Sequence, residues 1–493
     1  MSRPSLAGRA TLAVLLFIGF YALALGMAGA LLYIPYAEVT YLHRINGRIT
    51  IFAIVGAGAI LWAIIPRIDR FHAPGPSLTR KDQPRLFTTL DDVARLAEQE
   101  MPPEVYLVAE MNAWVAQRGG IMGFGSRRVM GLGLPLMQTL SVSQMRAVLA
   151  HEFGHYHGGD TALGPWIYKT RAAIFRTVHG VSHSTLLSKP FEWYGKAFLR
   201  ITHAISRRQE YAADALAARI SGTTTAIEAL KAVHGAGMAF EPYWHSEVVP
   251  AIQKGFRPPL AEGFRQFVAA PPIASNVVQA IEKEIAEGKV DPYDTHPPLR
   301  DRIAALEAER PVSHRGDDRA PAISLLDNVS ALEQALLDEM VIDDYRGKLA
   351  PLAWEEAGER IWVPLWHEQA RANGEVLEGI TPDMLPKFAE DLGGLAVRLK
   401  LVDDRGEADD AVTRHSAHVL GTALAVALSD RGFAVRALPG HPVFFDRDGL
   451  SITPFQALGD LADGTLSAES WRSQIERAGI AAIDLGNSRG QSR

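Results

Sequence analysis

The residues with the clearest chemical potential are two histidines and a glutamate in the segment His151-Glu152-Phe153-Gly154-His155. Residues four apart lie on one face of an α-helix, so both imidazoles can bind one zinc ion. Glu152 would lie about 100° around that helix from His151, where its carboxylate can activate a zinc-bound water molecule. The chain has no cysteine, so any metal must be held by His, Asp or Glu. The pattern predicts one zinc ion per chain and hydrolytic chemistry.

A third protein ligand has to come from elsewhere in the chain. The motif does not extend to H-E-x-x-H-x-x-G-x-x-H, because Thr161 stands at the last position. The segment 206–218, SRRQEYAADALAA, places Glu210 and Asp214 four residues apart on one helical face. Glu210 could bind zinc while Asp214 accepts the free N–H of a liganding imidazole. The alternative is a solvated acidic pair that partners the two preceding arginines.

The segment Leu140–Asp160 is predicted to form the helix that carries the two histidines. Ser141 and Gln144 match a capping box at its start, and Gly158 and Gly159 predict its end. Apolar residues along one side of the segment indicate packing into a core, where two histidines and a glutamate need partners. A chance match on an exposed helix is the alternative.

Two apolar segments, residues 11–36 and 49–66, contain no charged residue and predict a transmembrane helical hairpin. A helix needs about 20 apolar residues to cross the hydrocarbon core of a bilayer. A cleavable signal peptide is the alternative for the first segment, which is longer than the usual apolar core of such a signal. Basic residues flank the hairpin on both sides and outnumber those in its short loop, which predicts an integral membrane protein with a cytoplasmic body.

The remaining sequence predicts a mainly α fold with a small β-sheet. We expect the membrane hairpin in residues 1–70, a catalytic domain in residues 71–310 and an accessory α+β region in residues 311–493. The breaks are the Pro- and Gly-containing segments 72–83 and 311–321. The net charge of −6 gives no electrostatic case for nucleic acid as a partner.

The last part of the chain, residues 322–493, shows no catalytic motif. One helix is predicted to end at Gly432, and Asp448-Gly449 predicts the turn of a β-hairpin. Substrate recognition, partner binding and stabilisation of the catalytic domain all stay open as roles for this region.

Six pieces in the same order resemble the HtpX-like membrane zinc metalloproteases, a family related to the CAAX prenyl-protein endoproteases. They are the apolar pair, Asn112-Ala113-Trp114, the strand-like RRVMGLGLPLM, the two helices above, and Thr295-His296-Pro297-Pro298 leading to Arg302. The resemblance covers about residues 10 to 310. It implies a zincin fold of the gluzincin type, with Glu210 as the third ligand and Asp214 as its supporting acid.

The resemblance also implies roles for residues outside the two helices. His296 and Arg302 would lie near the metal, where they could stabilise the oxyanion formed during peptide hydrolysis; a helix-capping histidine is the alternative for His296. The segment Arg127–Met137 would be an edge strand that pairs with an extended substrate. Asn112 would add a hydrogen bond to that substrate.

One region departs from the family pattern. HtpX-like proteins often carry further hydrophobic segments between the two zinc-binding helices, whereas residues 163–205 interleave basic, acidic and aromatic side chains. The composition suits a helix on the membrane surface, and it suits helix packing within the domain equally well.

Together these observations predict a membrane-anchored zinc endopeptidase of the bacterial inner membrane. Unfolded or membrane proteins would be its substrates, in a quality-control role, and prenyl-protein processing stays open. The alternatives are a zinc-binding membrane scaffold or signalling protein without activity, and a zinc hydrolase of lipids or small amides. The intact Glu152 favours a protease over a scaffold.

Overall fold

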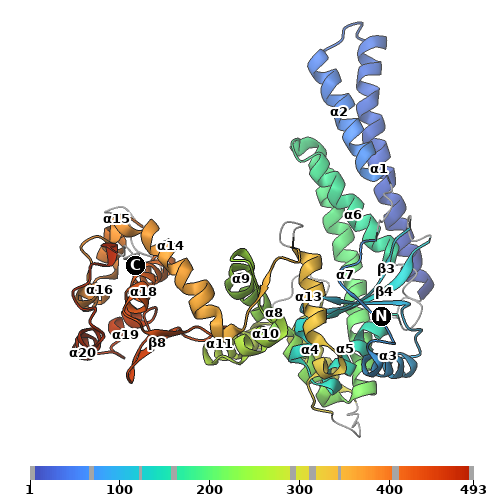
Figure 1. Ribbon diagram of the computed structural model, residues 1–493. Helices are drawn as coiled ribbons and strands as arrows, with labels where there is room; N and C mark the ends of the chain where they lie inside the picture. The colour runs from blue at the N-terminus through green and yellow to red at the C-terminus, as the bar shows by residue number, and fades with distance from the viewer. Residues whose placement is uncertain are drawn as a thin grey trace. The chain divides into compact units, whose positions relative to one another are not determined.

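The computed structural model describes residues 6–65, 71–120, 125–156, 164–288, 296–309, 318–341, 346–401 and 410–487 (Figure 1). The fold is mainly α-helical with small sheets, as predicted. The chain divides into two compact units, the first made of Met1–Gly237 and Val278–Glu339 and the second of Met238–Val277 and Met340–Arg493. The predicted three-part division at residues 70 and 310 stays a prediction.

The first unit begins with two long helices, α1 (Leu6–Thr40) and α2 (Gly47–Ile64), the second capped by the Asn46 side chain. The windows Val14–Thr40 and Gly47–Ile64 are long and apolar enough to cross a membrane, and their most apolar stretches are only 22% and 33% buried. A core helix of a soluble domain would be mostly buried. The exposed apolar surface therefore favours the predicted membrane hairpin.

Helix α6 (Gly164–Gly180) and the first half of α7 (Thr185–Ser221) pack along α1 and α2. Gly56 of α2 leaves room for Leu187, because a Cβ at this glycine would lie 2.9 Å from the leucine Cδ1. The Tyr194 hydroxyl donates a hydrogen bond to a backbone carbonyl of α1 at 2.5 Å. The described residues of the charged and aromatic segment therefore pack against the apolar pair, and contact of this segment with a membrane surface stays a prediction.

A four-stranded sheet lies beside the metal-site helices, with the strand order β1-β2-β4-β3. Strand β2 pairs with β4 in parallel, and β3 pairs with β4 antiparallel. The strands are β1 (Ser77–Leu78), β2 (Glu104–Val108), β3 (Ala113–Arg118) and β4 (Arg127–Gly133).

The prediction of an edge strand over Arg127–Met137 is wrong. Strand β4 lies between two neighbours, β3 is the edge, and Leu134–Thr139 forms helix α4. Pro135 begins that helix because it lacks the N–H that a further strand residue would need. The unbroken apolar run of β4, buried from Val129 onward, is typical of an interior strand.

Helix α5 (Val142–Gly154) carries His151, has His155 as its C-cap residue and starts with the predicted capping box. The Ser141 hydroxyl accepts from the Gln144 N–H, and the Gln144 side chain accepts from the Ser141 N–H. The helix ends at Gly154, ahead of the predicted stop at Gly158, which lies outside the described residues. Glycine is a weak helix former, which is consistent with the earlier end. The other elements of this unit are α3 (Pro84–Leu96), α12 (Leu299–Ala308), η3 (Ala322–Leu325) and α13 (Val329–Met340).

The second unit has its own apolar core around α18 (Asp410–Asp430) and a three-stranded sheet. Asp448 and Gly449 both adopt positive φ, at 51° and 75°, and form the predicted hairpin turn between β8 (Phe444–Arg447) and β9 (Leu450–Ile452). Gly432, predicted to end the preceding helix, has a φ of 76° two residues after α18. This unit combines helices with a small sheet, while the α+β module over residues 311–493 stays a prediction, because residues up to Glu339 belong to the first unit.

The chain passes between the units within α8 (Thr223–Tyr243), within α11 (Pro271–Glu287) and at the end of α13. The remaining elements of the second unit are η2 (Trp244–Val248), α9 (Val249–Gln253), β5 (Phe256–Arg257), α10 (Leu260–Ala269), β6 (Ala350–Pro351), η4 (Trp354–Glu356), η5 (Gly358–Trp362), α14 (Val363–Ala372), α15 (Gly374–Leu377), η6 (Pro382–Met384), α16 (Leu385–Glu390), α17 (Leu392–Arg398), β7 (Ala434–Arg436), α19 (Ala457–Ala462), α20 (Ala468–Ala478) and η7 (Leu485–Asn487).

Candidate metal centre and active site

The candidate site forms where α5 packs closely against α7. A Cβ added at Gly154 would lie 2.8 Å from the Cα of Ala213, which is fully buried. The glycine between the two histidines therefore allows the two helix backbones to approach within contact distance. This approach brings the histidines of α5 opposite Glu210 of α7.

We expect Gly154→Ala to weaken both the fold and the metal site. Alanine favours a helix over glycine by about 1 kcal/mol, but overpacking a tight contact costs about 1–3 kcal/mol. Zinc retention against a weak chelator and thermal unfolding measure the effect. Gly237→Ala in α8 is the matched control, because nothing lies within 4 Å of a Cβ at that glycine. Equal stabilisation by both substitutions would contradict the close approach of α5 and α7.

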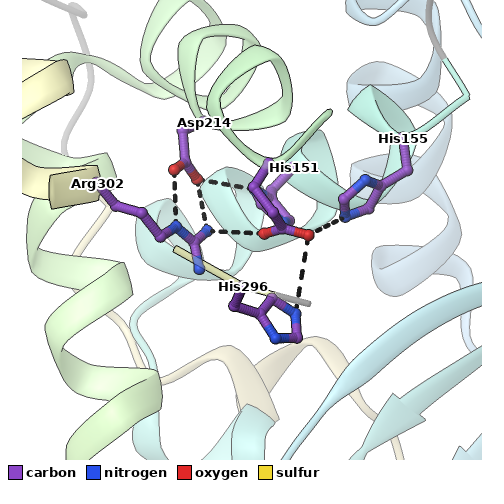
Figure 2. A network of polar contacts seen from close by, with 6 residues as sticks. His151, His155, Asp214, His296 and Arg302 are labelled. Carbon is purple, nitrogen blue, oxygen red and sulfur yellow. Dashed lines mark hydrogen bonds and ion pairs between the residues drawn. The ribbon is translucent and has the colours of Figure 1, made fainter. Parts of the chain in front are cut away.

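His151, His155 and Glu210 converge on one point (Figure 2). Nε2 of His151 lies 3.5 Å from Oε2 of Glu210, and Nε2 of His155 lies 3.5 Å from Oε1 of the same carboxylate. The candidate ligand atoms of the three residues all lie within 4.8 Å of one another. The three residues could therefore hold one metal ion.

The spacing and chemistry of these residues fit zinc. Tetrahedral zinc with bonds of about 2.0–2.1 Å keeps neighbouring ligand atoms about 3.3 Å apart, close to the 3.5 Å separations in this site. Oε2 of Glu210 is buried and has no hydrogen-bond partner in the part of the chain that the structure describes. A bound cation would satisfy this oxygen, because a buried polar atom without a partner is costly.

Asp214 connects the metal site to α12. Its Oδ1 lies 2.9 Å from Nδ1 of His151. On its other side Arg302 donates from Nε and Nη2 at 2.8 and 2.6 Å, a two-pronged hydrogen bond. Arg302 and Asp214 are each only 5% exposed, and Arg302 Nη2 also lies 3.5 Å from Glu210. The guanidinium therefore contacts both Asp214 and Glu210 of α7. Figure 2 shows its two hydrogen bonds to Asp214.

The charges of the site shift one another's pKa. Burial works to raise the pKa of Asp214, but the hydrogen bonds from Arg302 outweigh it and lower this pKa to about 2. Burial works to lower the pKa of His151, but the carboxylates of Asp214 and Glu210 raise it to about 9. Burial and the neighbouring His151 charge lower the pKa of His155 to about 4. A metal ion that binds His151 must therefore displace a proton.

Glu152 is not one of the three residues that could hold a metal ion. Burial raises the pKa of its carboxyl to about 7, although the His151 charge and a hydrogen bond from the Val115 backbone N–H oppose the rise. A general base is most effective when its pKa lies near the working pH. Glu152 also lines the cavity described below, so its carboxylate has access to a bound molecule.

The open edge of the sheet faces the metal-site helix at Val115. The Tyr156 hydroxyl donates to the Val115 carbonyl at 2.7 Å, and the Arg128 guanidinium lies 4.7 Å from the centre of the tyrosine ring. Tyr156 and Glu152 thus bind the carbonyl and the N–H of one edge residue. Sequence reasoning missed this contact, although the tyrosine directly after His155 was visible as a polar side chain next to the zinc motif.

A cavity of about 370 Å³ adjoins the candidate metal centre. Among the predicted site residues, its lining includes Asn112, His151, Glu152, Asp214, His296 and Arg302. His296 Nε2 lies 3.7 Å from Glu210 Oε1, and its side chain is 57% exposed. The Asn112 backbone carbonyl accepts a hydrogen bond from Gly133 at 2.9 Å. The structure therefore brings together every residue that the sequence singled out for the site.

The comparisons with known proteins agree with this arrangement. Residues 80–310 match the model of peptidase family M48. Protease HtpX of Pseudomonas putida strain GB-1 is 25% identical over 249 residues, covering 46% of this chain and 72% of the relative. A protease HtpX homolog of Thermodesulfovibrio yellowstonii is 25% identical over 250 residues, covering 47% and 77%. Protease HtpX of Ectopseudomonas mendocina is 24% identical over 287 residues, covering 53% and 87%. No solved structure gives a significant match.

The fold and the site define a metallopeptidase domain joined to two apolar helices. Residues 80–310 are similar to peptidase family M48, and the predicted likeness to the HtpX-like membrane metalloproteases is confirmed.

Proposed function

We propose that this protein is a zinc-dependent endopeptidase anchored in a bacterial inner membrane. The observation that carries the proposal is the convergence of His151, His155 and Glu210 beside the buried carboxyl of Glu152. The M48 match and the HtpX relatives support the same activity. One zinc ion per chain would be held by the three converging residues.

In the proposed hydrolysis, different residues bind the metal and transfer the proton. A zinc ion held by His151, His155 and Glu210 supplies Lewis-acid activation of water and of the scissile carbonyl. Glu152 accepts the proton of the attacking water at its carboxylate and passes it to the leaving amine. The raised pKa of Glu152, about 7, makes both transfers accessible near neutral pH.

The residues around the base hold the reacting groups in place. Asp214 orients the His151 imidazole, and Arg302 holds Asp214. Because its Nε and Nη2 donate to Asp214, Arg302 acts as a positioning residue. His296, which is half exposed beside Glu210, is better placed to stabilise the oxyanion, and Asn112 to contact the substrate in the cavity.

An extended peptide would bind along the edge strand β3. The backbone N–H and C=O groups of the even-numbered residues of β3 point toward β4, as the hydrogen bond from the Gly133 N–H to the Asn112 carbonyl indicates. The backbone groups of Ala113, Val115 and Gln117 therefore point to the open edge. A substrate that pairs with Val115 would take the place of the Tyr156 hydroxyl. Recognition through backbone groups gives loose sequence specificity and suits unfolded or membrane proteins as substrates.

The charge distribution favours a cytoplasmic catalytic domain. Arg3 and Arg9 precede the apolar segment 11–36 and five basic residues follow the apolar segment 49–66, whereas the loop between these segments has only Arg44 and Arg48. The accessory region from residue 311 onward would support the catalytic domain or its substrates.

Chelator-sensitive proteolysis tests the proposed function. Zinc-loaded protein in detergent is expected to cleave an unfolded protein such as casein and to stop when a chelator removes the metal, and zinc should restore cleavage. Metal content near one zinc per chain is measured on the same samples. Zinc binding without cleavage of any unfolded protein would favour the scaffold alternative. Hydrolysis of lipids or small amides alone would favour the non-proteolytic hydrolase, and preferential cleavage of prenylated peptides would redirect the proposal to prenyl-protein processing.

A further inference from the structure

The cavity beside the metal centre is lined by small apolar side chains on several helices. Helix α8 contributes Ala226, Ala229, Leu230 and Val233, and Ala147 and Ala217 come from α5 and α7. A cavity of about 370 Å³ is large enough for a long amino-acid side chain. Because alanine side chains are small, they leave space in the cavity for a bulkier substrate side chain. Their apolar surface suits a chain of methylene groups.

Two titratable residues line the cavity in addition to those of the candidate metal centre. His234 of α8 and Glu284 of α11 both line the cavity, with their side chains 29% and 33% exposed. Nε2 of His234 lies 3.6 Å from Oε1 of Glu284, which is longer than a hydrogen bond. Burial lowers the pKa of His234, which favours the neutral imidazole. The pair then carries the negative charge of Glu284.

The other carboxylates of the lining already have partners. Asp214 is held by Arg302, and Glu152 accepts from the Val115 N–H beside the metal ligands. Among the described residues, Glu284 has no arginine or lysine within ion-pair distance. Within the described parts of the chain, the cavity thus contains one carboxylate that no arginine or lysine pairs with.

We propose that this cavity receives a lysine or arginine side chain of the substrate and that Glu284 selects it. The inference rests on the proposed peptidase function, because the cavity shares Glu152 and His151 with the catalytic site. The methylene stem would lie against the alanines of α8, as long basic side chains do on apolar surfaces. The cationic head would then form a charge-assisted hydrogen bond with the Glu284 carboxylate. Backbone pairing at β3 would set the register of the substrate, and Glu284 would set the residue preferred next to the scissile bond.

The test separates binding from hydrolysis. Two unfolded peptides, identical except for lysine or its uncharged isostere norleucine, are titrated by fluorescence anisotropy against full-length, zinc-loaded Glu152→Gln protein. The lysine peptide is expected to bind about 10- to 100-fold more tightly, the range for a hydrogen bond to a charged group. Adding Glu284→Gln should remove this difference. Adding Glu282→Gln, an exposed acidic residue on the same helix that does not line the cavity, should leave it unchanged.

The outcomes distinguish the two proposals. Equal binding of both peptides, or a lysine preference that survives Glu284→Gln, overturns the inference even where wild-type protein cleaves casein. A lysine preference that depends on Glu284, in a protein that cleaves no substrate, supports the binding site for basic residues and contradicts the proposed peptidase function. Sites of casein cleavage mapped by mass spectrometry should show lysine or arginine enriched next to the broken bond in wild type and not in Glu284→Gln.

Discussion

Glu152→Gln is expected to lower the rate of casein cleavage by about 10²- to 10⁴-fold, the range that general acid–base catalysis contributes. The amide keeps the size and the burial of the side chain but cannot accept the proton of the attacking water. The metal ligands stay in place, so zinc content should stay near that of the wild type. Cleavage rate and zinc content measured on one preparation check both halves of the expectation.

The wild-type rate itself should report the titration of this residue. Because burial raises the pKa of Glu152 to about 7, we expect the rate to fall as the pH drops below that value, where the base is protonated. A Glu152→Gln protein that retained full cleavage would assign the proton transfer to another group. Loss of zinc in the same variant would show that Glu152 supports the metal site instead.

Arg302→Met is expected to destabilise the metal-free protein by about 3–5 kcal/mol, the cost of removing one partner of a buried ion pair. Methionine has a similar reach, but it leaves the 5%-exposed Asp214 carboxylate without its two hydrogen bonds. The freed carboxylate should also orient His151 less well, which we expect to weaken zinc binding by about 10- to 100-fold. Chemical unfolding and competitive zinc titration measure the two effects.

A double-mutant cycle isolates the Arg302–Asp214 pair. Removing the second charge with Asp214→Asn should recover part of the stability lost in Arg302→Met, because no unpaired ion then remains buried. Arg300→Met, two residues earlier on the same helix and 46% exposed at its side chain, is the matched control and should change stability little. Additive losses in the double variant would contradict the coupling between these two residues.

The local sequence was sufficient to predict the elements that carry the site. Helix spacing places His151 and His155 on one face, and the capping box starts α5 at the residue predicted. The apolar helices and the Asp448-Gly449 turn were predicted for the same reason, since they depend on neighbours within a few residues. The end of α5 was predicted too late, because Gly154 already ends the helix where it approaches α7.

Pairing between distant segments could not be predicted in the same way. The run Arg127–Met137 has the apolar character of a strand, but only the sheet order shows that β4 is interior and β3 is the edge. Tyr156 meets Val115 across 41 residues of chain. The sequence around neither residue contains a local pattern that predicts this contact.

The sequence by itself determined the kind of chemistry, because the H-E-x-x-H spacing and the absence of cysteine restrict the metal ligands to a few residues. The tertiary structure decided how that chemistry is supported. Arg302 reaches Asp214 across 88 residues, and the cavity draws its lining from α5, α7, α8, α11 and α12. Helical spacing is fixed within a turn by backbone geometry, whereas contacts between helices depend on how a whole core packs.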